Sequence, residues 1–252
     1  MSDRRQPRLK EIADRLGLSI TTVSRALNGY TEVSEASRER IFATAKAMGY
    51  VPNQIGRMLA SGKTGLIGLP LPVRDGRMMD GFLGEFVAGL AEGLVARGRD
   101  LMIATVAGGQ SDLDVIRRMV DGRRVDAMVV NRATVDDPRV AFLIERNFPF
   151  VVHGRVLEPR APYAWYDTDG EAAFSEAVNL LAGLGHRRFG YFGASEQLTF
   201  AVMRRRGYEG AMKAAGLAVD PAAMAAAAPF DDEAVKAAAN RLIAARPRPT
   251  PI

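Results

Sequence analysis

From Gly65 onward the chain alternates short apolar runs with amphipathic segments, and this alternation limits its fold more than any other feature. The apolar runs are LIGLPLP, LMIATV, DAMVV, PFVVHG and RFGYFG. The helical segments cover residues 82–97, 113–120, 137–147, 171–184, 202–215 and 233–245. Short apolar strands separated by helices indicate a parallel, doubly wound α/β sheet. A second set begins near Trp165, so we expect two such sheets with a cleft at the carboxyl ends of their strands.

The excess of positive charge lies entirely in the first quarter of the chain. Residues 1–64 contain 11 Lys or Arg and 6 Asp or Glu, whereas the remaining residues contain 23 of each. A small basic module attached to a neutral body suggests a polyanionic partner for the module alone. A solvated basic surface would explain the charge about equally well.

Composition excludes several classes of protein. The chain has no Cys, so disulfides and thiolate metal sites are excluded, and we expect neither a metal nor a cofactor. No run of eighteen apolar residues predicts a membrane span, and the charged start MSDRRQPRLK leads into no apolar segment typical of a secretion signal. We therefore expect a cytoplasmic protein. No GxxxxGK[ST] loop is present and no GxGxxG follows a strand, which disfavours kinases and dehydrogenases.

Two short amphipathic segments in the basic quarter predict a helix-turn-helix. Residues 9–16 place apolar side chains at helical spacing, Gly17 can end that helix, and Ser19 can cap a second one. The inward residues of the second helix are Val23, Ala26 and Leu27. Its outward residues are Ile20, Thr21, Thr22, Ser24, Arg25 and Asn28. Short hydroxyls there allow close approach to phosphates and an Arg can read guanine, whereas a purely structural helical hairpin is the alternative.

A third helix and a candidate hinge follow. Ser34 is a plausible N-cap for a helix whose apolar stripe ends before Gly49. Pro52 interrupts regular structure, and residues 53–60 have a helical pattern but are too short to be stable alone. This segment lies between the basic module and the neutral body, which makes it a candidate hinge.

At this point the sequence closely resembles the lactose-repressor (LacI) family of transcriptional regulators. The resemblance is almost continuous over residues 9–68, from LKEIADRLGLSITTVSRALNGY to VPNQIGRMLASGKTGLIG. It implies that Ile20, Thr21 and Arg25 read bases and that Thr22, Ser24 and Asn28 contact phosphates. It also implies a homodimer on a pseudo-palindromic operator in double-stranded DNA.

The same resemblance assigns roles in the hinge. Leu59 matches the leucine that this family inserts into the minor groove, where such a wedge kinks the duplex. A buried core leucine is the alternative for Leu59 taken alone. The remaining hinge residues are Asn53, Gln54, Ile55, Gly56, Arg57 and Met58. Gly56 stands where many relatives have Ala, which costs helix stability by roughly 1 kcal/mol.

Several polar and aromatic residues follow the predicted strands and suggest an effector site. They are Arg132, His153, Arg155, Trp165, Asp167 and Arg204. Arg and Asp suit sugar hydroxyls and a Trp face can stack on a pyranose ring, whereas surface ion pairs and a core Trp are the alternative. The family resemblance places Arg155 and Arg204 at effector-contacting positions and implies a periplasmic-binding-protein-like (type I) effector domain. The strings NRATVDDPRV, PFVVHGR and YAWYD look most like the branch that responds to α-glucosides.

These observations predict a repressor of carbohydrate-utilisation genes that is controlled by a small sugar and is not an enzyme. A sugar-binding protein or sugar-modifying enzyme with an accessory DNA-binding module is the alternative. The expected domains are a helix-turn-helix domain (1–51), a hinge and linker (52–64) and an effector domain (65–252), divided into subdomains 65–160 and 161–252. The end at ARPRPTPI suggests truncation, so we expect an incomplete second subdomain and poor effector binding.

Overall fold

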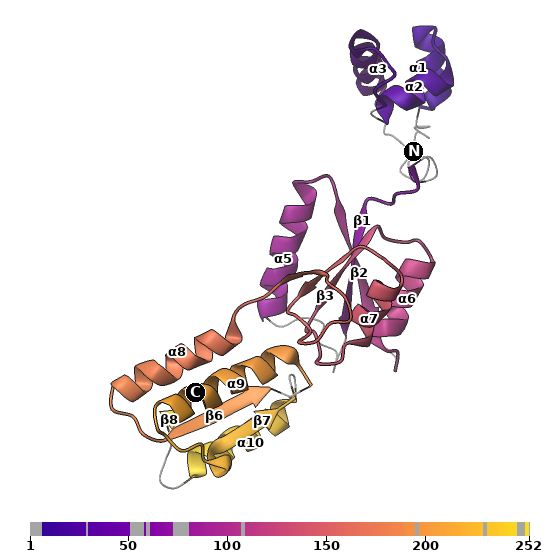
Figure 1. Cartoon of the computed structure of the whole chain (residues 1–252). Helices are drawn as coiled ribbons and strands as arrows, with labels where there is room; N and C mark the ends of the chain where they lie inside the picture. The colour runs from indigo at the N-terminus through magenta and orange to yellow at the C-terminus, as the bar shows by residue number, and fades with distance from the viewer. Residues whose placement is uncertain are drawn as a thin grey trace, which may run out of the picture. The chain divides into compact units, whose positions relative to one another are not determined.

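A computed structural model of the chain (Figure 1) describes residues 7–28, 30–50, 58, 61–72, 81–106, 109–194, 197–228, 231–245 and 250–251. The chain divides into two compact units, Met1–Gly65 and Leu66–Ile252. The first is the helical unit and the second is the α/β unit. No helix in the described ranges has both the length and the apolar character needed to cross a bilayer.

The helical unit contains three helices around one small core. They are α1 (Leu9–Leu16), α2 (Ile20–Leu27) and α3 (Glu35–Ala47). The buried side chains of this core are Ile12, Ala13, Val23, Ala26, Val33, Ile41 and Ala45. They recur at helical spacing on each helix, so each helix buries one stripe and exposes the other. The predicted inward residues of α1 and α2 are thereby confirmed.

The turn between α1 and α2 follows from its residues. Gly17 ends α1 in the left-handed conformation at φ 65°, which a residue without Cβ adopts at little cost. Ser19 then caps α2 by accepting a hydrogen bond from the Thr22 amide at 3.0 Å. The structure confirms both predicted signals.

The α/β unit begins with a five-stranded parallel sheet in the order β2-β1-β3-β4-β5. Its strands are β1 (Leu66–Pro72), β2 (Asp100–Val106), β3 (Ala127–Asn131), β4 (Phe150–His153) and β5 (Ala164–Tyr166). Its helices are α5 (Gly81–Val95), α6 (Asp112–Asp121) and α7 (Pro138–Glu145). We call residues 66–166 the first lobe.

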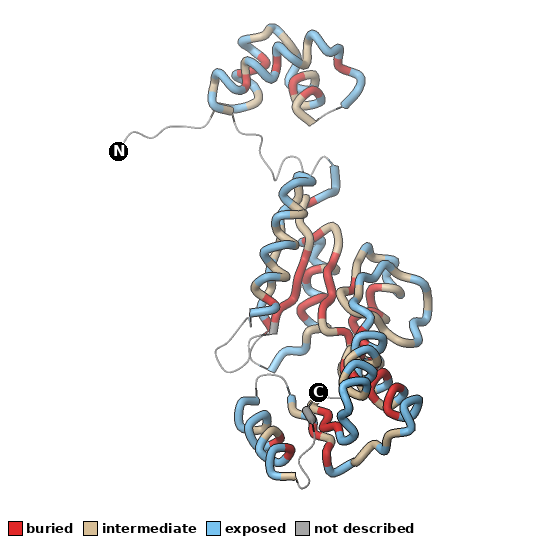
Figure 2. The backbone as a smooth tube through the Cα atoms, turned by 90° about the vertical axis from the view of Figure 1, so that its left-hand side faces the viewer, coloured by how far each residue is buried: buried red, intermediate tan, exposed pale blue. Residues whose placement is uncertain are grey.

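Helices cover both faces of the first sheet (Figure 1). Met128 and Val130 of β3 pack in the core that α6 and α7 supply, whereas Val129 packs with Leu83 of α5. This alternation is the period of two that a strand buried on both faces requires. The buried residues accordingly run along the strands of the sheet (Figure 2).

Strand β5 belongs to the first sheet, whereas the sequence pattern assigned this segment to the second subdomain. Trp165 pairs with Val152 of β4 in a parallel ladder, so the first sheet continues to Tyr166. The pattern placed the start of the second subdomain at residue 161 and its first elements near Trp165. β5 is only three residues long and contains no β-branched residue, so its sequence is a weak signal for a strand.

A smaller parallel sheet follows in the order β7-β6-β8. Its strands are β6 (Phe189–Ala194), β7 (Met224–Ala227) and β8 (Thr250–Pro251). Its helices are α8 (Gly170–Gly183), α9 (Thr199–Ala214), the 3₁₀ turn η1 (Pro221–Ala223) and α10 (Asp232–Ala244). We call residues 170–251 the second lobe. The predicted fold class, a helical module followed by two parallel α/β sheets with a smaller second one, is confirmed.

Helices α8 and α9 approach each other very closely at Gly207. A Cβ added to Gly207 would lie 2.1 Å from the backbone oxygen of Glu171 on α8. Only a residue without a side chain fits this contact, so Gly207 fixes how α9 lies against the first turn of α8.

Main-chain hydrogen bonds join the two lobes. The Val135 amide donates to the Gln197 carbonyl and the Thr199 amide donates to the Ala133 carbonyl, both at 3.0 Å. Between them Thr134 and Leu198 form an antiparallel bridge. The segment that follows β3 is therefore bonded to the start of α9, and we call these contacts the lobe junction.

Candidate functional sites

The exposed face of α2 carries the residues expected to read DNA. Ile20 is 48% exposed, and Thr21 and Arg25 are also exposed. Val23 and Ala26 are fully buried on the opposite side of the helix. Because the buried stripe fixes the rotation of α2 about its own axis, the three expected base-reading residues are held outward together.

The three expected phosphate-contacting residues are half-buried and bonded locally. The Thr22 and Ser19 hydroxyls lie 2.8 Å apart, and the Asn28 side-chain amide donates to the Ser24 hydroxyl at 3.3 Å. Each group keeps further donor or acceptor capacity. These bonds set the side-chain directions at both ends of α2.

Glu32, in the turn after α2, also shapes this face and was missed from the sequence, and Arg38 of α3 holds that turn. The Glu32 carboxylate lies 3.5 Å from the Arg25 guanidinium. Arg38 donates to the Tyr30 carbonyl at 2.8 Å and to the Val33 carbonyl at 3.4 Å. A signal was present, because Glu32 is an acidic residue close to a face otherwise poor in carboxylates.

Most of the expected hinge lies outside the described residues. This applies to the minor-groove candidate Leu59 and to the hinge residues Asn53, Gln54, Ile55, Gly56 and Arg57. Met58 is described; it is 37% exposed and its carbonyl accepts from the Gly62 amide at 2.8 Å.

The parallel ladder brings most of the effector candidates to one edge of the first sheet. His153 ends β4, Arg132 directly follows β3, and Asp167 directly follows β5. Strands β3, β4 and β5 are neighbours in the sheet, so their carboxyl ends meet at the same edge. This is the edge at which open α/β sheets bind ligands.

Arg155 is the centre of this group. Its Nε lies 3.5 Å from Asp167 Oδ2, and its guanidinium carbon lies 5.2 Å from the centre of the Trp165 ring. The same Nε donates to the sulfur of Met203 on α9, at 3.4 Å, so Arg155 reaches the second lobe. Trp165 is half exposed at 51% and is therefore not a core residue. The structure thus brings Arg155, Trp165 and Asp167 together.

His153 lies among aromatic rings that the sequence did not single out. Its ring centre lies 4.7 Å from Phe86, 5.7 Å from Phe82 and 6.4 Å from Tyr166. Burial lowers the pKa of His153, and the nearby Asp167 carboxylate opposes this shift only in part. The shift favours the neutral form of His153, in which one ring nitrogen is a donor and the other an acceptor.

Arg204 lies on α9 in the second lobe. Its guanidinium carbon lies 4.9 Å from the Phe200 ring centre and 5.8 Å from that of Phe174. Its stem passes close to Gly170 at the start of α8, where an added Cβ would lie 3.1 Å from Arg204 Cγ. Gly170 and Gly207 together therefore allow α9 to carry Arg204 along the amino end of α8.

Arg132 takes a left-handed backbone conformation at φ 51°, which is uncommon for a non-glycine residue. The Arg139 guanidinium holds this turn by donating to the carbonyls of Asn131, at 3.2 Å, and Arg132, at 3.0 Å. It also binds both oxygens of the Asp137 carboxylate and contacts Asp112 at 3.0 Å. We call Asp137, Arg139 and Asp112 the buried charge network.

Asp137, and not its neighbour Asp136, caps α7. Burial raises the pKa of the Asp137 carboxyl, but the hydrogen bonds and charge of Arg139 outweigh burial and leave that pKa below its usual range. The same partners raise the pKa of Arg139 against the effect of burial. Both groups are therefore fully charged at neutral pH.

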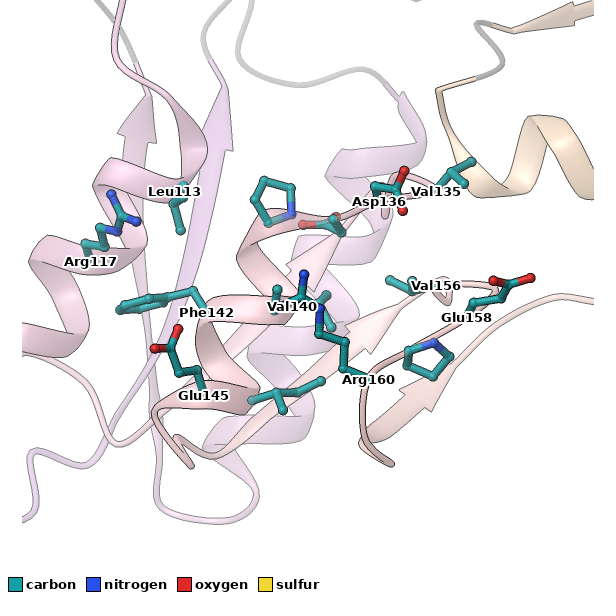
Figure 3. Close-up of a pocket in the computed structure, with 15 residues that line it drawn as sticks. Leu113, Arg117, Val135, Asp136, Val140, Phe142, Glu145, Val156, Glu158 and Arg160 are labelled. Atoms are coloured by element: carbon teal, nitrogen blue, oxygen red, sulfur yellow. The ribbon is translucent and has the colours of Figure 1, made fainter.

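A separate pocket of about 350 Å³ lies between α6, α7 and the segment after β4 (Figure 3). It combines apolar walls, such as Val140 and Val156, with charged side chains such as Arg117, Glu145 and Arg160. None of the six effector candidates lines it. In the ranges that the structure describes, no cluster of three His, Asp or Glu side chains is placed to hold a metal ion.

Both units of the chain are similar to known protein families. Residues 8–53 match the family described as bacterial regulatory proteins, lacI family, and residues 178–252 match the periplasmic binding protein-like domain. The HTH-type transcriptional regulator AglR of Rhizobium meliloti (strain 1021) is 40% identical over 214 residues, which cover 85% of this chain and 60% of AglR. The chain therefore spans about three fifths of that relative.

Two solved structures resemble this fold. A transcriptional regulator CelR–cellobiose complex has a TM-score of 0.63 at 28% identity, covering 94% of this chain and 70% of that chain. The lac repressor dimer bound to operator and the anti-inducer ONPF has a TM-score of 0.69 at 20% identity, covering 89% and 66%. AglR and CelR are transcriptional regulators, in agreement with the expectation that the chain is not an enzyme.

Proposed function

Because the chain belongs to the lacI family of bacterial regulatory proteins, we propose that it is a sequence-specific DNA-binding regulator that represses carbohydrate-utilisation genes in the cytoplasm. The observation that carries the proposal is the face of α2, where Ile20, Thr21 and Arg25 are exposed and the opposite stripe is buried. The net charge of +5, all of it within residues 1–64, supplies the attraction to phosphates.

Selection of binding sites from a random duplex library by the full chain tests this proposal. We expect one enriched half-site in which Arg25→Ala lowers the preference for a single base pair by about 5- to 150-fold, the effect of about 1–3 kcal/mol for a paired Arg–guanine contact. Arg123→Ala, in the α/β unit, is the control with the same loss of charge. Failure of the wild-type chain to enrich any sequence at moderate salt would overturn the proposal.

The operator would be pseudo-palindromic, because a two-fold dimer presents two copies of α2. The lac repressor structure, which resembles this fold, is a dimer on operator. In this proposal residues 53–58 form the hinge and Leu59 enters the minor groove at the centre of the operator. If the selected duplexes contain one half-site each, without an inverted copy at a fixed spacing, the result would argue against the dimer.

We further propose a sugar effector at the carboxyl edge of the first sheet. Arg155 and Asp167 offer a donor and an acceptor for hydroxyls, Trp165 offers an exposed ring face, and Arg132 and His153 lie at neighbouring strand ends. Arg204 of the second lobe completes the set in this proposal. The CelR structure contains cellobiose, and the strings around these residues resemble the α-glucoside branch. An α-glucoside such as maltose is therefore the first ligand to test.

Trp165 is the only Trp in the chain, so its fluorescence reports directly on this site. Titration with maltose should change its emission weakly but saturably, and Arg155→Ala should remove the change. Arg160→Ala removes the same charge from the separate pocket and should leave the titration unaltered. Loss of the signal with Arg160→Ala but not with Arg155→Ala would overturn the assignment of the site.

The alternative of a sugar-modifying enzyme has less support. The relatives reported above are regulators, and the group around Arg155 combines a guanidinium, one carboxylate and an indole instead of a pair of carboxylates suited to glycoside hydrolysis.

A further inference from the structure

The turn between α2 and α3 is held rigidly on both sides of Glu32. On one side the Tyr30 amide donates to the Arg25 carbonyl at 3.1 Å, and Arg38 binds the Tyr30 carbonyl at 2.8 Å. On the other side Val33 is only 8% exposed and packs in the core of the helical unit. The backbone of Glu32 is therefore fixed relative to α2.

The Glu32 carboxylate faces the one cation on the exposed side of α2. Glu32 Oε2 lies 3.5 Å from Arg25 Nη1, and the two side chains are 61% and 55% exposed. Ion pairs this exposed contribute little to folding stability. The position of Glu32 beside Arg25, which is expected to read bases, indicates a role in DNA recognition.

We propose that Glu32 is a positioning residue for Arg25, and this proposal rests on the DNA-binding function proposed above. Glu32 orients the planar Arg25 guanidinium before DNA is bound, which reduces the side-chain entropy lost when Arg25 forms a paired contact with a base. Its carboxylate also repels phosphates and competes with them for Arg25. When Arg25 binds DNA it must give up its ion pair with Glu32. The paired contact with a matching base pair compensates for this loss, whereas contacts with a random sequence do not, so Glu32 increases discrimination.

The test uses the full chain and the duplex that it selects. Arg25→Ala first identifies the base pair that Arg25 reads. Glu32→Gln should then raise affinity for random duplex about two- to fivefold and lower discrimination at that base pair by a similar factor, in keeping with the modest strength of an exposed pair. Discrimination at the other positions should stay unchanged, which a merely structural role would not produce.

Glu39→Gln is the matched control. Glu39 is an exposed residue of α3 that forms no ion pair with the described residues, and its replacement removes the same charge from the same unit. It should leave discrimination at the Arg25 base pair unaltered. Equal loss of discrimination with Glu39→Gln would show a general charge effect and overturn the proposal.

A double-mutant cycle separates positioning from direct contact. If Glu32 acts through Arg25, Glu32→Gln has no effect on discrimination in a chain that already carries Arg25→Ala. A persisting effect would mean that Glu32 touches the base pairs itself, which overturns the positioning role. If the wild type selects a sequence and Glu32→Gln changes nothing, only the Glu32 proposal fails. If the wild type selects no sequence, the proposed function fails first.

Discussion

The two lobes of the α/β unit bury polar groups in opposite ways. In the first lobe Asp137 and Arg139 are almost fully buried, and each charged group is paired and hydrogen-bonded. In the second lobe the hydroxyls of Tyr208 and Thr199 are buried without a hydrogen-bond partner among the described residues. An unpaired buried charge lowers the stability of the fold far more than an unpaired buried hydroxyl does. Asp137 and Arg139 must therefore have all their partners, whereas the hydroxyls of Tyr208 and Thr199 can lack theirs.

The largest expected effect comes from breaking the buried charge network. Asp137→Asn leaves the Arg139 guanidinium buried beside a neutral amide and should destabilise the α/β unit by about 3–5 kcal/mol. Asp136→Asn, at the exposed neighbouring position, is the control and should change stability little. Urea unfolding followed by Trp165 fluorescence measures both. A small effect at Asp137 would show that the lobes do not differ as described.

The loss of stability caused by Asp137→Asn should depend on pH, and the direction of this dependence follows from the pKa of Asp137. The pKa of Asp137 in the folded chain lies below its ordinary value of 3.8, so ionised Asp137 contributes stability above that value. This contribution is lost as the pH falls through the lower folded pKa. The stability difference between wild type and Asp137→Asn should therefore narrow on acidification below about pH 4.

A smaller effect is expected where the second lobe depends on close packing. Gly207→Ala places a Cβ against the Glu171 carbonyl and should destabilise by about 1–3 kcal/mol, because α8 and α9 must separate. Gly210→Ala on the same helix meets no atom within 4 Å and should stabilise by up to about 1 kcal/mol through helix propensity. Equal effects of the two substitutions would contradict the close α8–α9 contact.

The smallest effect is expected at the unpartnered hydroxyl. Tyr208→Phe removes a buried polar atom that makes no hydrogen bond, so stability should stay the same or rise by up to about 1 kcal/mol. Tyr191→Phe is the comparison, because the Tyr191 hydroxyl donates to the Ala201 carbonyl at 3.5 Å and its loss should destabilise slightly. Thermal unfolding of both variants measures this difference within the second lobe, and clear destabilisation by Tyr208→Phe would contradict the incomplete bonding described there.

The sequence predicted those parts of the structure that depend on nearby residues. The Gly17 turn, the Ser19 cap and the apolar strands are local signals, and the structure confirms them. Strand β5 is the short AWY and β7 is the alanine-rich MAAA, and neither contains the β-branched residues that favour strands. Their pairing partners, not their composition, make them strands.

For the candidate sites, sequence position predicted where residues lie but not what they touch. Arg155 was identified because it follows the predicted strand PFVVHG, and Trp165 and Asp167 were identified by their chemistry; the parallel ladder then brings the three together. The contact of Arg155 with Met203 and the rings around His153 join residues far apart in the chain, so no local pattern contains them. Glu32 escaped notice because it lies after α2 in sequence but beside Arg25 in space.

The lobe junction has a consequence for how the sequence of the α/β unit can change. Its hydrogen bonds run between backbone atoms at Ala133, Val135, Gln197 and Thr199, so they depend on chain path and not on side-chain identity. Side-chain substitutions at these positions can therefore accumulate while the connection between the lobes persists. A scaffold joined in this way can change its side chains without losing the arrangement of its two lobes.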